Sequence, residues 1–295
     1  MLSVQYDKTD KSAVLSQKQG CERLNNSPIG VFDSGLGGLT AVKRLRELLP
    51  KENIIYLGDT GRVPYGSRSR DTIIGFTRDN IAFMRQFGVK AIVVACNTMC
   101  ATALGVVRGE TEVPMLGVVA PAVEKAAAVT KNNRVGVIAT VATIGSGIYK
   151  KSLRELVPDV SVFSMACPLL VPLVESGKIR RGDKESETAL REYLTPLMQE
   201  KIDTLILGCT HYPLLMPLIR DICGDGVNYV DSGKVTAEAV PQWLAEQDLL
   251  ADEDGEGITE YFVTGDKAGF EATGSMFLRE DIRGLVHRVS LEDKE

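Results

Sequence analysis

Short apolar runs alternate along this chain with longer amphipathic segments, and this alternation restricts the possible folds more than any other feature. Apolar runs of this length are typical of strands that are covered on both faces. The amphipathic segments between them are typical of helices packed against a sheet. Strands and helices in regular alternation predict an α/β fold with open, mostly parallel sheets.

Several segments follow this pattern closely enough to be assigned. We expect strands at residues 29–32, 53–57, 91–95, 115–118, 135–139, 160–164 and 204–207. We expect helices at residues 39–49, 71–87, 120–130, 148–156, 183–200 and 237–247. The first 26 residues and the acidic segment 251–257 are predicted to be loop or disordered.

Size and charge argue against several classes of protein. The 295 residues, 44% of them hydrophobic, can bury a core large enough for two domains. The formal net charge of −5 provides no basic surface for nucleic acid or an anionic membrane. No apolar stretch approaches the ~18 residues of a membrane span, and the first 26 residues lack the apolar core of a secretory signal. These features favour a cytoplasmic protein that acts on a small molecule.

The cysteines favour chemistry over structural cross-links. They form no C-x-x-C pair and the chain has only two histidines, so a structural zinc site is not expected. In a reducing cytoplasm the thiols stay free. Cys100 lies four residues after Cys96, a spacing that would put both on one face of a helix, and is explained by packing. Cys21, Cys167 and Cys223 lie in no recognisable motif.

The two halves of the sequence resemble each other. Residues 29–32 match 135–138, the apolar run 54–56 resembles the run 160–163, and the Cys96 motif in residues 93–98 resembles the Cys209 motif in residues 205–210. The last pair places Cys96 and Cys209 at equivalent positions, each just after a predicted strand. Because open α/β sheets bind ligands beyond the carboxyl ends of their strands, two related halves facing each other would present one cysteine from each side of a cleft.

This repeat predicts two similar α/β domains related by a pseudo-two-fold axis, with the active site in the cleft between them. The repeat divides near residue 119, and the chain returns to the first half after Cys209. We therefore expect a first domain of residues 27–119 plus 231–295, a second domain of residues 120–230, and a flexible N-terminal extension of residues 1–26.

Two glycine-containing loops are candidate binding segments. Residues 33–38, with the sequence DSGLGG, connect a predicted strand to a predicted helix, and their N–H groups and the Ser34 hydroxyl could hold an anion. The dinucleotide fingerprint fails, because Thr40 stands where Gly or Ala is required. In residues 63–66, Tyr65 and Gly66 could close over a small polar ligand. Both segments could instead be plain turns.

Cys96 and Cys209 are the candidate catalytic residues. They are followed by side chains that can hydrogen-bond a carboxylate, Asn97 and Thr98 in one case and Thr210 in the other. A nearby helix N-terminus would lower a thiol pKa from its usual ~8.5. One thiolate could then remove a proton from a substrate carbon while the opposing thiol returns one. Each cysteine alone is more simply a small buried hydrophobe, but the matched pair favours catalysis.

His211 and Glu175 are candidate partners of Cys209. His211 lies two residues after Cys209 and could polarise its thiol, although a histidine at a strand end is commonly structural. Glu175 is a carboxylate within an apolar run, where desolvation is costly without a role. An exposed glutamate at a helix end is the alternative interpretation.

Four motifs together resemble the bacterial glutamate racemase family. They are DSGLGG at 33–38, PYG at 64–66, ACNT at 95–98 and LGCTHYPL at 207–214, in the family's order and spacing. The likeness runs from about residue 27 to residue 279, and the pairing of Cys-Asn-Thr with Gly-Cys-Thr-His is highly specific. The extension of about 26 residues and the Ala120-Pro121 pair depart from the usual pattern.

The resemblance implies an enzyme that interconverts L- and D-glutamate with no cofactor and no metal, supplying D-glutamate for peptidoglycan in a bacterial cytoplasm. Cys96 and Cys209 would exchange acid and base roles, with Asp33 assisting Cys96 while Glu175 and His211 assist Cys209. The substrate-binding residues that it implies are Asp33, Ser34, Tyr65, Gly66, Asn97, Thr98, Thr140, Thr143, Thr210 and His211. We also expect a homodimer whose only other partner is the substrate.

Three alternatives stay open. Aspartate racemases share a double-cysteine fold, but they tend to carry a glutamate where this chain has His211. A thiol redox protein would need two cysteines close together in the sequence, and Cys96 and Cys209 are far apart. A non-enzymatic amino-acid binding module would have no need of paired thiols in a cleft.

Overall fold

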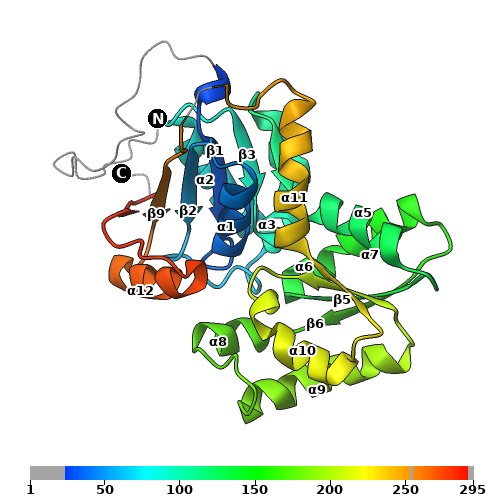
Figure 1. The fold of residues 1–295 in the computed structure, drawn as a ribbon. Coiled ribbons are helices and arrows are strands. Elements are labelled where there is room, and N and C mark those ends of the chain that lie inside the picture. The colour runs from blue at the N-terminus through cyan, green and yellow to red at the C-terminus, as the bar shows by residue number, and fades with distance from the viewer. Residues whose placement is uncertain (1–23, 253–254, 292–295) are drawn as a thin grey trace.

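Two parallel sheets, each covered by helices on both faces, form two lobes (Figure 1). The computed structural model describes residues 24–252 and 255–291. This arrangement confirms the predicted α/β fold with two mostly parallel-sheet domains. Residues 1–23 of the predicted extension lie outside the described residues. Leu24–Asn26 form a short 3₁₀ helix (η2) where no structure was predicted, since Asn25 O accepts a hydrogen bond from Lys90.

The first sheet has six strands among the described residues, in the order β10-β9-β2-β1-β3-β4. The second has four, in the order β6-β5-β7-β8. The strands of the first sheet are β1 (Ile29–Asp33), β2 (Ile54–Gly58), β3 (Ala91–Val94), β4 (Met115–Gly117), β9 (Thr259–Val263) and β10 (Val286–Arg288). Those of the second are β5 (Arg134–Ala139), β6 (Ser161–Ala166), β7 (Thr204–Gly208) and β8 (Asn228–Asp231).

The internal repeat of the sequence is visible in the topology. The order β2-β1-β3-β4 in one sheet is the order β6-β5-β7-β8 in the other, with parallel pairing throughout. Strands β3 and β7 therefore occupy equivalent places. Each ends one or two residues before a cysteine, β3 before Cys96 and β7 before Cys209.

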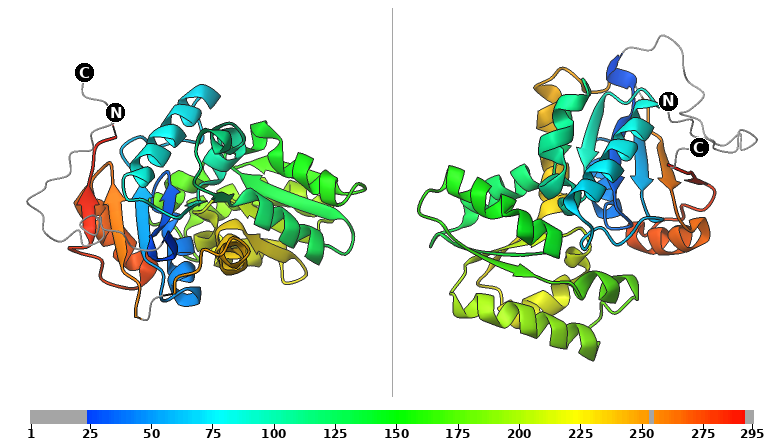
Figure 2. Two further views of the ribbon diagram at one scale, coloured as in Figure 1. Left: turned by 90° about the horizontal axis from the view of Figure 1, so that it is seen from above. Right: turned by 180° about the vertical axis from the view of Figure 1, so that it is seen from behind.

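Helices cover both faces of each sheet. Figure 1 shows α1 in front of the first sheet, and the view from behind in Figure 2 shows α2 on its other face. The helices around the first sheet are α1 (Leu39–Leu48), α2 (Arg70–Arg85), α3 (Asn97–Thr102), α4 (Leu104–Val107), α11 (Ser232–Ala245) and α12 (Lys267–Leu278). Those around the second are α5 (Val119–Val129), α6 (Val141–Ser146), α7 (Ile148–Leu156), α8 (Leu170–Glu175), α9 (Lys184–Gln199) and α10 (Met216–Cys223).

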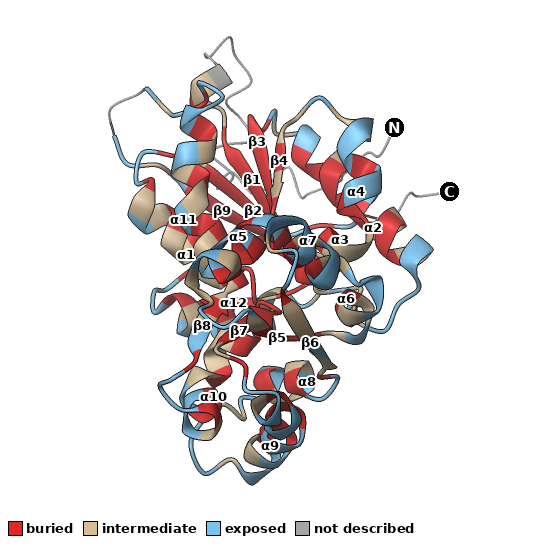
Figure 3. Ribbon diagram, turned by 90° about the vertical axis from the view of Figure 1, so that its right-hand side faces the viewer, coloured by how far each residue is buried: buried red, intermediate tan, exposed pale blue. Residues whose placement is uncertain are grey.

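The strands alternate their side chains between two apolar cores. In β2, Ile54 and Tyr56 pack towards α1 and α11, whereas Ile55 and Leu57 pack towards α2. The core on the α2 side of the first sheet continues without a break to α5 and α7 on the second sheet. The inner strands of both sheets are buried, the edge strand β6 of the second sheet is mostly of intermediate burial, and the outer surfaces of the helices are exposed (Figure 3). The shared core holds the two lobes together at the carboxyl ends of their strands.

The predicted elements are all present, with ends that differ by up to five residues. The largest difference is at α11, predicted at residues 237–247, which begins at Ser232 because the Asp231 side chain accepts a hydrogen bond from Lys234 N. Strands β8, β9 and β10 and helices α3, α4, α6, α8, α10 and α12 were not predicted. The described part of the acidic segment, residues 251–252 and 255–257, contains no helix or strand, as predicted.

Candidate active site

A cavity of about 380 Å³ lies between the carboxyl ends of the two sheets. Both candidate thiols line it, Cys96 from the first lobe and Cys209 from the second. Most of the other predicted site residues share the lining: Ser34, Tyr65, Gly66, Asn97, Thr98, Thr140, Glu175, Thr210 and His211. Asp33 and Thr143 are outside the lining. The structure thus brings together, from the two halves of the sequence, the groups that the motifs identified.

Cys96 is held at the beginning of α3, where it is the N-cap residue. Its Sγ donates to Ser34 Oγ at 3.5 Å, and the side chain is 4% exposed. Burial, and then the nearby Asp33 carboxylate, raise the pKa of Cys96. The prediction that a helix N-terminus would lower this pKa is therefore wrong, because desolvation outweighs the helix dipole. The raised pKa favours the thiol form of Cys96 at neutral pH.

Cys209 belongs to a chain of three groups. Its Sγ lies 3.8 Å from His211 Nδ1, and His211 Nε2 lies 3.3 Å from Glu175 Oε1. The second contact has an ion-pair distance but not hydrogen-bond geometry, since His211 Nε2 has no hydrogen-bond partner among the described residues. Burial lowers the pKa of His211, but Cys209 and Glu175 together outweigh it and raise the pKa to about 10. The raised pKa favours the protonated imidazolium form of His211 beside these two groups.

Glu175 lies at an exposed helix end and also beside the candidate site. It is the last residue of α8, and its side chain is 41% exposed. It nevertheless lines the cavity and faces His211. Its exposure means that water screens the contact with His211, so the pair orients the imidazole more than it stabilises the fold.

Asp33 supports the loop that carries Ser34. Its carboxylate is fully buried, Oδ2 accepts from Gly38 N at 2.9 Å, and Oδ1 has no hydrogen-bond partner among the described residues. The same loop reaches across to the second lobe, because a Cβ atom at Gly37 would lie 2.1 Å from Thr210 Oγ1. Only glycine permits so close an approach.

Three threonine hydroxyls meet where the lobes join. Thr98 Oγ1 from α3 lies 2.9 Å from Thr140 Oγ1 and 3.4 Å from Thr143 Oγ1, at the start of α6. Thr140 is the N-cap of α6 and accepts from Thr143 N at 3.3 Å. Thr143 is buried behind the other two, so it orients them and does not reach the cavity.

Tyr65 contributes its ring to the cavity, but its hydroxyl points elsewhere. The hydroxyl donates to the buried Asp59 carboxylate, which also binds Arg62 and Thr264. The hydroxyl of Tyr65 is therefore engaged by Asp59, while Tyr65 itself, like Gly66, lines the cavity. The next residue, Gly66, joins the lobes: its carbonyl accepts from Ala142 N at 3.1 Å.

Comparison with known proteins identifies the family. Residues 29–240 match the model of the Asp/Glu/Hydantoin racemases. The chain belongs to this racemase family. It is 43% identical over 264 residues to a glutamate racemase of Geobacter metallireducens, which covers 90% of this chain and 97% of that protein. The predicted class of enzyme, an amino-acid racemase and thus an isomerase, is confirmed.

Solved structures of relatives have the same fold as this racemase. A glutamate racemase isoform from Bacillus anthracis superimposes with a TM-score of 0.86 at 40% identity, covering 92% of this chain and all (100%) of that one. A glutamate racemase from Francisella tularensis in complex with D-glutamate gives 0.84 at 37% identity, covering 91% and 99%.

Some residues of the racemase cavity had no signal in the sequence. Cys167, Pro168, Val171 and Pro172 form an apolar part of its wall near Glu175. Burial, and then the charge of Cys209, raise the pKa of Cys167, so this third thiol stays protonated. Cys167 directly follows the carboxyl end of β6, the strand equivalent to β2. That strand end could have indicated the position of Cys167, but β6 was predicted to end two residues early.

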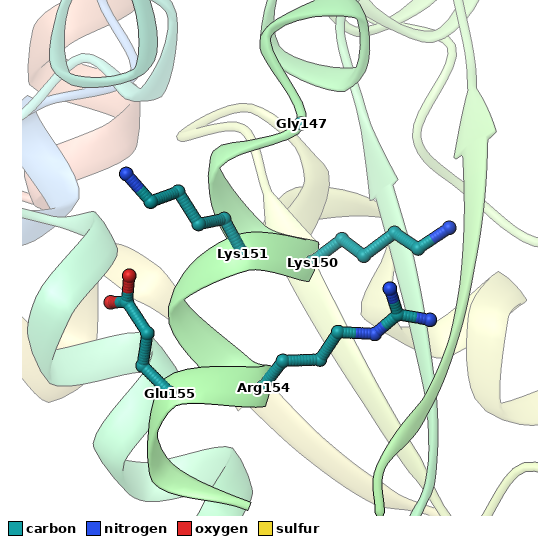
Figure 4. Close-up of a pocket in the computed structure, with 5 residues that line it drawn as sticks. All are labelled: Gly147, Lys150, Lys151, Arg154 and Glu155. Carbon is teal, nitrogen blue, oxygen red and sulfur yellow. The ribbon is translucent and has the colours of Figure 1, made fainter. Parts of the chain in front are cut away.

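A second depression, of about 470 Å³, lies on the outer face of α7. It is lined by Gly147, Lys150, Lys151, Arg154 and Glu155. The side chains of Lys151 and Glu155 lie on one side of the helix and those of Lys150 and Arg154 on the other (Figure 4). It contains no thiol and no residue of the predicted site. Within residues 24–252 and 255–291, no group of three or more His, Cys, Asp or Glu side chains is placed to hold a metal ion. None of the helices in those ranges has the length and apolar character required to cross a membrane.

Proposed function

We propose that this racemase interconverts L- and D-glutamate by a two-base proton transfer between Cys96 and Cys209. One observation carries the proposal: the two thiols come from equivalent strand ends of different sheets and line one cavity. Inversion at a carbon atom requires removal of a proton from one face and delivery to the other. Two thiols on facing lobes satisfy this requirement, and the relatives named glutamate racemases support glutamate as the substrate.

The resting charges favour one assignment of roles. A protonated His211, 3.8 Å from Cys209 Sγ, can stabilise a thiolate there, whereas burial, and then Asp33, raise the pKa of Cys96 and keep it protonated. We assign Cys209 as the base and Cys96 as the acid for one enantiomer. For the other, Cys96 must first give up its proton, and the buried Asp33 carboxylate, whose Oδ1 accepts no hydrogen bond from any described residue, is the group that assists it.

The substrate-binding groups follow from the lining. A glutamate zwitterion brings two carboxylates and an ammonium, which need several hydrogen-bond partners once they leave water. Ser34, Gly66, Thr98, Thr140, Thr210 and the backbone N–H of Asn97 are the groups assigned to this task. Asp33 and Thr143 lie outside the lining, so neither is assigned to contact the substrate: Asp33 assists Cys96, and Thr143 orients Thr98 and Thr140.

The wider role is part of the same proposal. We assign the chain to a bacterial cytoplasm, where D-glutamate is required for peptidoglycan, and to a homodimer. The division into residues 27–119 plus 231–295 and residues 120–230 is also proposed, and it is supported by the membership of the strands in the two sheets. The two thiols supply both proton transfers, so we assign no cofactor to the reaction.

A circular-dichroism assay of optical activity tests the proposal. The purified protein is given D-glutamate, L-glutamate and both enantiomers of aspartate, without added pyridoxal phosphate or metal. We expect each glutamate enantiomer to become racemic while aspartate stays unchanged. Racemisation of aspartate alone would assign the site to an aspartate racemase, and turnover of neither amino acid would exclude the proposed activity.

A further inference from the structure

The side chain of Asn97 lies at the cavity, but its hydrogen bonds are made inside the protein. Its Nδ2 donates to Ser232 Oγ at 3.0 Å, and its Oδ1 accepts from the hydroxyl of Tyr149 at 2.5 Å. Ser232 Oγ in turn donates to the carbonyl of Leu207 at 2.9 Å. Asn97, Ser232 and Tyr149 are all at most 3% exposed. Four residues thus form a buried hydrogen-bonded chain.

The carbonyl of Leu207, at the end of this row of hydrogen bonds, determines the direction of every bond in the row. A backbone carbonyl only accepts, so the Ser232 hydroxyl must donate to Leu207 and therefore accepts from Asn97. This places the amide nitrogen of Asn97 towards Ser232 and its oxygen towards Tyr149, which must donate. An asparagine satisfies both partners, whereas an aspartate in its usual ionised form has no donor for Ser232.

The two ends of the chain lie next to the two thiols. Asn97 directly follows Cys96, and Leu207 precedes Cys209 by two residues at the end of β7. Ser232 lies between them, at the first turn of α11, where the polypeptide leaves the second sheet and returns to the first. The hydrogen bonds from Asn97 to Ser232 and from Ser232 to Leu207 therefore connect the cysteine-bearing turn of one lobe to that of the other.

We propose that Ser232 is a positioning residue that sets the separation of Cys96 and Cys209, with Tyr149 holding Asn97 in the orientation that Ser232 requires. The inference rests on the proposed two-thiol reaction. Two groups that exchange roles at one carbon atom must both stay within reach of it, and a misplacement of about 1 Å can cost about 10²-fold in rate. A buried link between the two turns meets this need without touching the substrate.

The test compares a broken link with a matched change nearby. Ser232→Ala removes both hydrogen bonds, and Tyr149→Phe removes one without changing the shape of the side chain. The control is Thr236→Val, one turn further along α11, since among the described residues the buried Thr236 hydroxyl bonds only to Ser232 O, within its own helix. All three variants are assayed with D- and L-glutamate at a temperature where far-UV circular dichroism shows each to be fully folded.

We expect Ser232→Ala to lower kcat by about 10- to 100-fold in both directions, with a smaller change in the KM for glutamate. Tyr149→Phe should lower kcat less, and Thr236→Val should keep wild-type kcat even where its melting temperature falls. Wild-type kcat in folded Ser232→Ala, or a loss of kcat in Thr236→Val equal to that in Ser232→Ala, would overturn this inference and leave the proposed function standing. A wild-type protein that does not racemise glutamate would remove the proposed function and this inference together.

Discussion

Replacing Gly37 by alanine tests whether the contact between the lobes holds the second half of the site in place. A Cβ atom at Gly37 would lie 2.1 Å from Thr210 Oγ1, 2.6 Å from Thr210 Cβ and 3.0 Å from His211 Nδ1. Ordinary contacts between such atoms are at about 3.5–4 Å. Rotation of the threonine side chain cannot relieve the clash, because Thr210 Cβ itself is too close. The backbone that carries Thr210 and His211 must therefore move by about 1 Å.

The magnitude follows from that displacement. Overpacking of a buried contact costs about 1–3 kcal/mol of stability, and a 1 Å misplacement of reacting groups costs about 10²-fold in rate. We expect Gly37→Ala to fold, to melt at a lower temperature, and to lose about 10²-fold in kcat/KM for both enantiomers. The loss must be equal in the two directions, because the equilibrium constant for racemisation is unchanged.

The same loop provides the matched control. A Cβ atom at Gly35 would have Val63 Cγ1 at 4.0 Å as its only neighbour within that distance among the described residues, so Gly35→Ala should be tolerated. Activity is followed by circular dichroism with each glutamate enantiomer, and stability by urea unfolding. Near-wild-type kcat/KM in Gly37→Ala, or an equal loss in Gly35→Ala, would show that the lobes do not meet as described.

Three further outcomes follow from the site. Asp33→Asn and His211→Asn should reduce kcat by about 10²–10⁴-fold, each more strongly in a different direction of racemisation; wild-type kcat in both would refute their roles. Tyr65→Phe should keep its KM for glutamate but lose about 1–3 kcal/mol of unfolding free energy, because the buried Asp59 loses a partner; a large rise in KM would instead place the hydroxyl on the substrate. The pKa of His211 is raised from 6.5 to about 10, so its charge stabilises the fold fully below pH 6.5, and this stabilisation is lost as the pH rises through about 10. The difference in unfolding free energy between wild type and His211→Asn should shrink over that range, and a constant difference would contradict the assignment.

The fold was largely predictable because the inner strands β1, β2, β3, β5 and β7 are buried on both faces and therefore appear as unbroken apolar runs. The repeat was sufficient to pair Cys96 with Cys209 before any geometry was known. Strand β8 was missed because its sequence, Asn-Tyr-Val-Asp, begins and ends with polar residues at the edge of the second sheet. Strands β9 and β10 were missed because they follow a long return of the chain and add to a sheet whose other members are far away in the sequence.

The lining of the cavity was predictable from local motifs, but the direction of individual side chains was not. Nothing in the sequence near Tyr65 shows that Asp59 accepts its hydroxyl, and nothing near Asn97 shows that Ser232 and Tyr149 occupy its amide. These partners are supplied by tertiary contacts. The thiol pKa of Cys96 was misjudged for the same reason, since burial is a property of the fold and the helix dipole is a property of the local sequence.

Racemisation in heavy water tests the two-thiol mechanism most directly. The proton that one thiolate removes stays on the enzyme, and the opposite thiol delivers a hydrogen that has equilibrated with solvent. Early in the reaction, the product should therefore carry deuterium at the α-carbon while the remaining substrate stays largely protiated, and Cys209→Ala should lose racemisation by several orders of magnitude. Deuterium in recovered substrate at the level found in product, or racemisation retained in Cys209→Ala, would contradict the mechanism.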